Sequence, residues 1–261
     1  MTLWKHELKL SRISLLIWTA SIAFLIVICI FMFPEMEGQM DSVSDMFASM
    51  GSFSQAFGMD RLNFGEFMGF YGVECGNILG LGGAFFAAFT GILALAKEEK
   101  EHTAEFLLTH PISRTSVFVT KYLSLLTQIV LLNLIVLILS VLSAQMVGEE
   151  IQWKEFMLFH LAYFIMQIET GSICFSISAF LHRSGLGIGI GLASMLYFLN
   201  IIANLTEDAK WLKYLTPFGY TEGADIITEC ALDWKMIAVG IACAVVFLII
   251  AFLKYNKKDI S

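Results

Sequence analysis

The sequence predicts an all-α fold: a polytopic integral membrane protein with six transmembrane helices. Six long apolar stretches lie between short polar connections, and each is close to the ~20 apolar residues that cross a hydrocarbon layer about 30 Å thick. Hydrophobic residues make up 57% of the chain and charged residues only 15%, a composition that soluble domains rarely reach. We therefore expect one transmembrane domain over residues 1–261, with spans at about 14–33, 75–96, 117–144, 157–181, 185–203 and 236–253.

The basic residues predict how these spans are oriented. An even number of spans places both termini on one side, and Lys and Arg favour the cytoplasmic side. With the termini inside, inner segments carry eleven of the 16 Lys and Arg residues and outer loops carry five. We expect cytoplasmic termini and a multi-pass location in a bacterial plasma membrane. The outer loops hold fifteen of the 23 acids, which either favour release of cationic cargo or merely solvate the loops.

The outer loop after the first span predicts an interfacial helix. Met46, Met50, Phe53 and Phe57 share one helical face, beside polar residues at 45, 49 and 55. An apolar face of this kind is expected to lie on the outer membrane interface as a lid. Alternatively, a soft Met and Phe surface accommodates varied amphipathic cargo, which makes Met50 and Phe53 candidates for the substrate path.

Small residues recur in the second and fifth spans. Gly72, Gly76 and Gly80 repeat every four residues, and the fifth span opens with glycines at 185, 187, 189 and 191. Such faces let helix backbones approach closely. These faces either pack helices within one chain, or they form a dimer interface or a surface along which helices slide during gating.

Glu169 is the most unusual residue within a span, because an unpaired charge near the centre of a membrane helix costs several kcal/mol. It is a candidate proton or cation site, or part of a polar substrate path. The structural alternative is a protonated or hydrogen-bonded carboxyl that joins helices through Gln128, Asn133 or Gln167. Glu74, at the outer edge of the second span, raises the same question.

Motifs for catalysis are missing. The chain has no Gly-Lys dipeptide and hence no Walker A loop, and His6-Glu7 lacks the second His of a zincin. Five cysteines show no CxxC spacing, so we expect no metal site and an unpaired Cys75 and Cys230. We therefore expect no catalytic residue, no cofactor bound by this chain and no nucleic-acid partner.

The inner connection between the second and third spans predicts a short amphipathic helix at about 98–110. Glu98, Glu101 and Glu105 form its polar side, an apolar side follows at 106–108, and Pro111 ends it. Such a helix suits a groove of another protein, or it lies among lipid head groups. Its acids favour the protein partner.

This stretch resembles the signature of permease subunits of type-two ABC exporters, in which the helix couples to the ATPase. The matching residues are Glu98, Glu99, Glu101, Thr103, Glu105, Phe106, Leu107, Leu108, Pro111, Ser113 and Arg114. His102 stands where the family commonly has Gly, which changes the expected turn geometry. The N-terminal residues 3–7 with Arg12 resemble the family's inner interfacial helix, and residues 214–220 resemble its last outer loop.

The resemblance implies a half-transporter that pairs with itself or with a sister permease in the lipid bilayer. Each half would bind an ABC ATP-binding subunit, which carries the ATP and the magnesium. The coupling contact would be made by Glu98, Glu101, Thr103, Glu105, Phe106, Leu107, Leu108, Pro111 and Arg114. The chain is also similar to short permeases that export peptides, toxins or bacteriocins. Two other functions stay open: an ion-coupled secondary transporter that uses Glu169, and a non-transporting immunity or sensor module.

Overall fold

The computed structural model describes residues 2–37, 50–56, 59–96, 113–181 and 185–257. Over these residues the regular structure is helical and contains no strand. Six of the described helical segments are long and apolar enough to cross a membrane. The predicted all-α, six-span fold class is therefore confirmed.

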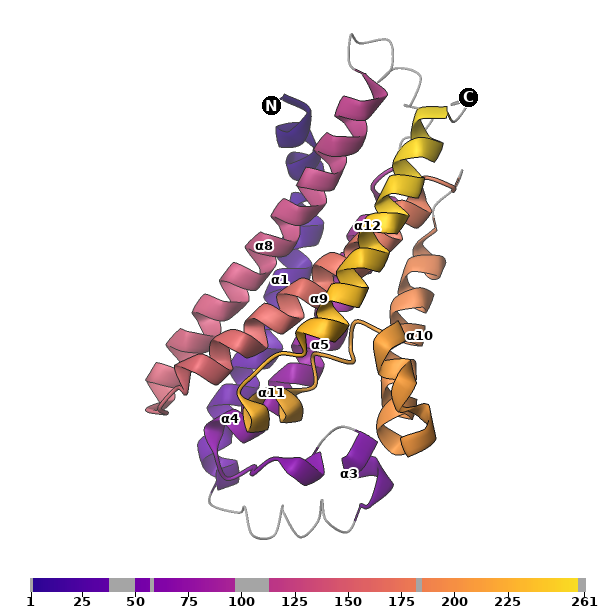
Figure 1. Ribbon diagram of the computed structural model, residues 1–261. Coiled ribbons are helices and arrows are strands. Elements are labelled where there is room, and N and C mark those ends of the chain that lie inside the picture. The colour runs from indigo at the N-terminus through magenta and orange to yellow at the C-terminus, as the bar shows by residue number, and fades with distance from the viewer. Residues whose placement is uncertain (1, 38–49, 57–58, 97–112, 182–184, 258–261) are drawn as a thin grey trace.

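The helices lie in one elongated bundle (Figure 1). The long helices are α1 (Thr2–Glu37), α5 (Gly76–Leu93), α8 (Arg114–Val147), α9 (Trp153–Ser178), α10 (Leu186–Leu205) and α12 (Trp234–Lys257). Both termini lie at one end of the bundle, which we call the termini end. The short helices α3 (Ser52–Ala56), α4 (Phe67–Phe70) and α11 (Gly223–Glu229) lie at the opposite end.

Helix α9 lies in the middle of the bundle, where it packs against α5, α8, α11 and α12. Its buried side chains include Phe156, Phe159 and Met166, and they form much of the core. Helix α1 packs mainly on α8, and α10 packs on α5. The bundle thus has one inner helix, α9. The pair α1 and α8 and the pair α5 and α10 lie around it and are more exposed.

The N-terminal residues do not form a separate interfacial helix, as the family resemblance implied. They are the first turns of α1, which runs without a break from Thr2 to Glu37. No Gly or Pro precedes Pro34 in this helix, so the backbone has no residue that favours a break. Trp4 Nε1 donates to Thr127 Oγ1 over 3.3 Å and joins these turns to α8.

The second span enters the bundle through a π-helical turn, η2 (Tyr71–Cys75), between α4 and α5. Gly76 and Gly80 then face α9 so closely that an added Cβ would lie 2.9 Å from Tyr163 atoms. These glycines therefore pack α5 against α9 within one chain. Gly187 and Gly191 of α10, by contrast, have no atom within 4 Å of an added Cβ.

Candidate functional site

Glu169 lies on the buried side of α9, where only 5% of the residue is exposed. Its Oε2 accepts a hydrogen bond of 2.8 Å from the Tyr220 hydroxyl. Gly240 of α12 lies against the same carboxyl, and an added Cβ there would overlap Oε2. The carboxyl therefore joins three segments: α9, α12 and the connection between η3 (Glu207–Leu215) and α11.

The hydrogen-bond partners that the sequence suggested for Glu169 were wrong. Asn133 Nδ2 donates to Gln167 Oε1 over 2.6 Å, and Gln128 Nε2 donates to the Ser124 carbonyl over 3.3 Å. The amides of Asn133 and Gln167 thus join α8 to α9 without Glu169. Sequence reasoning missed Tyr220 as the partner, although this tyrosine ends the segment that resembles the family's last outer loop.

Tyr220 lies outside the membrane-spanning helices but is buried. Burial, more than the neighbouring Glu169 carboxyl, raises the pKa of the Tyr220 hydroxyl well above its usual value. The hydroxyl therefore keeps its proton near neutral pH and donates a hydrogen bond to the Glu169 carboxyl oxygen.

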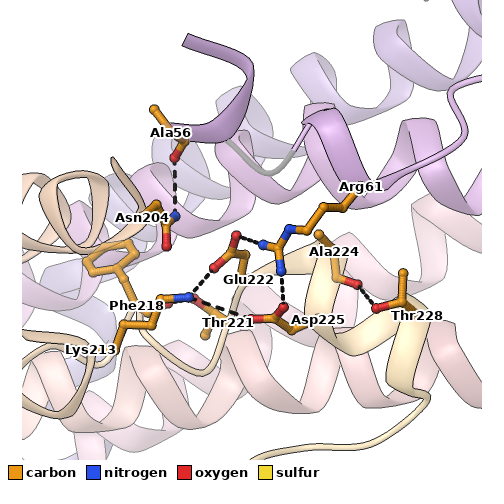
Figure 2. A network of polar contacts seen from close by, with 10 residues as sticks. All are labelled: Ala56, Arg61, Asn204, Lys213, Phe218, Thr221, Glu222, Ala224, Asp225 and Thr228. Atoms are coloured by element: carbon orange, nitrogen blue, oxygen red, sulfur yellow. Dashed lines mark hydrogen bonds and ion pairs between the residues drawn. The ribbon is translucent and has the colours of Figure 1, made fainter. Parts of the chain in front are cut away.

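Four charged residues form a network at the end of the bundle opposite the termini (Figure 2). The Arg61 guanidinium pairs with both Glu222 and Asp225. Lys213 Nζ lies 2.8 Å from Glu222 Oε2 and 3.7 Å from Asp225 Oδ2. Two cations thus balance two carboxylates, of which Glu222 is buried. The network ties η1 (Met59–Arg61) to η3 and to the start of α11.

A small pocket of about 50 Å³ lies next to this network, between α5 and α10. Its wall includes Asn77, Tyr197 and Asn200, and the Tyr197 hydroxyl donates to Asn77 Oδ1 over 3.4 Å. Asn204 Nδ2 of α10 donates to the Ala56 carbonyl over 3.2 Å, so α3 is held to α10 beside the pocket. Such a pocket holds a few water molecules but no peptide.

No described contact brings the predicted substrate-path residues together. Glu74 is half-buried in η2, and no described contact joins it to Glu169. Met50 is 44% exposed in a turn, because Gly51 has φ of +50° and α3 begins only at Ser52. The expected single helical face through Met50 and Phe53 is therefore wrong, since a left-handed glycine interrupts it. Met46 and Phe57 lie outside the described residues.

Most of the predicted coupling residues lie outside the described residues: Glu98, Glu101, Thr103, Glu105, Phe106, Leu107, Leu108 and Pro111. The helix that follows them starts with a defined cap, because Ser113 Oγ accepts from Ser116 N over 3.2 Å. Arg114, the first residue of α8, donates from Nη1 to the Asn256 carbonyl over 3.3 Å. The start of α8 is thus tied to the end of α12.

The described residues offer no group of three His, Cys, Asp or Glu side chains that could hold a metal ion. All five cysteines are free, and Cys230 Sγ donates to Glu155 Oε1 over 2.9 Å.

Comparison with protein families gives a match over residues 1–260, to a family described as ABC-2 family transporter protein. A comparison with curated proteins found no match.

Proposed function

Because the chain belongs to the ABC-2 family of transporter proteins, we propose that it exports a hydrophobic or amphipathic substrate, a peptide, with energy from a separate ATP-binding subunit. The observation that carries this proposal is the family match over residues 1–260, on a chain with six helices able to span a membrane. ATP and magnesium would bind to the partner subunit. The termini end of the bundle would face the cytoplasm, where ATP is available.

The connection between α5 and α8 is the proposed contact with the ATP-binding subunit. The sequence pattern predicts Glu101 and Glu105 on its polar side and Phe106 and Leu107 on its apolar side. A displacement of this connection would act directly on Arg114, the first residue of α8. The contact from Arg114 to the Asn256 carbonyl supports transmission of that displacement to α12.

The transport pathway is proposed to need a second permease, either another copy or a sister chain. Helix α10 presents exposed apolar side chains, among them Met195, Phe198 and Ile202. Its glycines at 187 and 191 leave open space on the same helix. A face of this kind would allow a helix of the second permease to approach closely.

The experiment that tests this function is purification of the tagged chain from its native membrane in mild detergent. We expect an ATP-binding subunit to copurify and to hydrolyse ATP in a vanadate-sensitive manner. Phe106→Ala and Glu105→Lys should uncouple hydrolysis from export while the chain still folds. Ile135→Ala, on the exposed side of α8, serves as the control and should behave like the unaltered chain.

Unaltered export by both coupling variants would contradict the proposed contact. Transport by the lone chain, driven by a proton or sodium gradient, would instead favour an ion-coupled carrier. In that case Glu169→Gln should abolish the transport.

A further inference from the structure

A cavity of about 400 Å³ lies between α1, α5 and α8, separate from the polar pocket at the other end of the bundle. Its wall includes Glu7 near the start of α1 and Leu93 near the end of α5, which places it in the half that carries the termini. The volume falls within the range of small-molecule sites. The described residues that line the cavity all belong to helices of one chain, so it does not depend on a second permease.

An ion pair lies in the wall of this cavity. Lys121 Nζ is 3.2 Å from Glu7 Oε1, and the Lys121 side chain is only 2% exposed. Removing two charges from water costs several kcal/mol per ion, and a buried pair often stabilises a fold no better than apolar residues would. Fold stability alone therefore explains this pair poorly, whereas a polar ligand in the cavity would use it.

The described wall favours a ligand without net charge. Glu7 and Lys121 contribute −1 and +1, and the other described residues of the lining are uncharged. A ligand with a net charge would lose hydration without gaining a net opposite charge. A head group that holds a positive and a negative charge side by side would instead find a partner for each.

The rest of the wall fits a molecule that is polar at one end and apolar along its body. Ser14, Thr90 and Gln128 add hydrogen-bonding groups. Phe89 and Leu125 provide apolar surface. Leu10 and Leu186 belong to the wall and are also 52% and 39% exposed, so the cavity reaches the outer surface of the bundle. In a membrane that surface faces lipid.

We propose that this cavity binds a zwitterionic phospholipid, which enters from the leaflet at the termini end. Its head group would lie at the pair formed by Glu7 and Lys121, and its acyl chain would lie along Phe89 and Leu125. The proposal concerns the single chain and does not depend on the proposed export function.

The test uses the full chain in nanodiscs of equimolar phosphatidylethanolamine and phosphatidylglycerol, followed by native mass spectrometry of the lipids retained after gentle release. The unaltered chain should retain phosphatidylethanolamine. Glu7→Gln leaves the described wall with a net positive charge, so the retained ratio should shift towards phosphatidylglycerol by about tenfold or more. Glu7→Gln combined with Lys121→Gln again leaves the described lining residues without net charge and should restore the original preference.

A second pair of variants tests lipid binding in the cavity if the charge variants fail to fold. Ser14→Phe puts a ring into the cavity and should abolish retention. Ile13→Phe adds a ring one residue away, where the side chain is 63% exposed, and should leave retention unchanged. The proposal is overturned if the unaltered chain retains no lipid, if both phenylalanine variants retain it equally, or if a folded Glu7→Gln chain keeps the original preference.

Discussion

The carboxyl of Glu169 shows how a single polar residue is accommodated in an apolar bundle. An unsatisfied carboxylate in such surroundings is costly, and the Tyr220 hydroxyl supplies a hydrogen bond. Helix α12 approaches the same group at Gly240, where there is no room for a side chain. The glycine in α12 is therefore explained by the carboxyl in α9.

We predict that Gly240→Ala destabilises the protein. Its Cβ would overlap Glu169 Oε2, so the carboxyl must move and its bond to Tyr220 must lengthen or break. Overpacking of this kind costs about 1–3 kcal/mol, and a thermal melt of the detergent-purified chain should show a clearly lower midpoint. Gly187→Ala is the matched control, because nothing lies within 4 Å of the added Cβ. Equal midpoints for the two variants would contradict this explanation.

The short helices opposite the termini depend on ion pairs as well as on packing. Segments η1, η3 and α11 are three, nine and seven residues long, too short to be stable helices by themselves. Arg61, Lys213, Glu222 and Asp225 connect all three. The arrangement of these segments therefore relies on cations placed on both sides of the buried Glu222.

We predict that the two cations of this network compensate for each other. Arg61→Gln or Lys213→Gln alone leaves Glu222 with one of these cations, so amide hydrogen exchange over residues 207–229 should rise little. The double variant leaves the buried carboxylate without either, and exchange should rise by more than the sum of the single effects. Lys235→Gln, at an exposed position of α12, is the control and should change nothing. If the increase in exchange in the double variant equals the sum of the increases in the two single variants, Arg61 and Lys213 act independently and the prediction is wrong.

The sequence predicted the elements whose signal is local and missed those that depend on distant contacts. Six apolar stretches were long enough to identify the spans. Tyr220 and Glu169 are 51 positions apart, and Lys121 and Glu7 are 114 apart, so no spacing rule could pair them. Lys121 follows the coupling segment by only a few residues, and its side chain is buried and paired with Glu7 of α1. The coupling residues at 98–111 stay a prediction.

At the scale of the whole molecule, the bundle has a wide apolar exterior. Helices α1, α10 and α12 are the least buried of the six spans. In the most apolar 18-residue stretch of each, only 28%, 22% and 22% of the residues are buried. Much of their exposed surface consists of large apolar side chains. Such a surface requires lipid or another apolar helix around it. The bundle is therefore suited to a membrane and to association within it.

The remaining prediction concerns the orientation of this bundle. Both termini lie at one end (Figure 1), and that end together with the inner connections holds eleven of the 16 basic residues. Because Lys and Arg are retained on the cytoplasmic side, a green fluorescent protein joined after Ser261 should fluoresce in bacteria. Alkaline phosphatase joined after Glu150, between α8 and α9, should be active because that connection would lie outside. The reciprocal fusions, phosphatase at Ser261 and fluorescent protein at Glu150, are the controls and should be silent. If the reciprocal fusions are active instead, the orientation is the opposite of the predicted one. The coupling segment would then lie on the side of the membrane that lacks ATP.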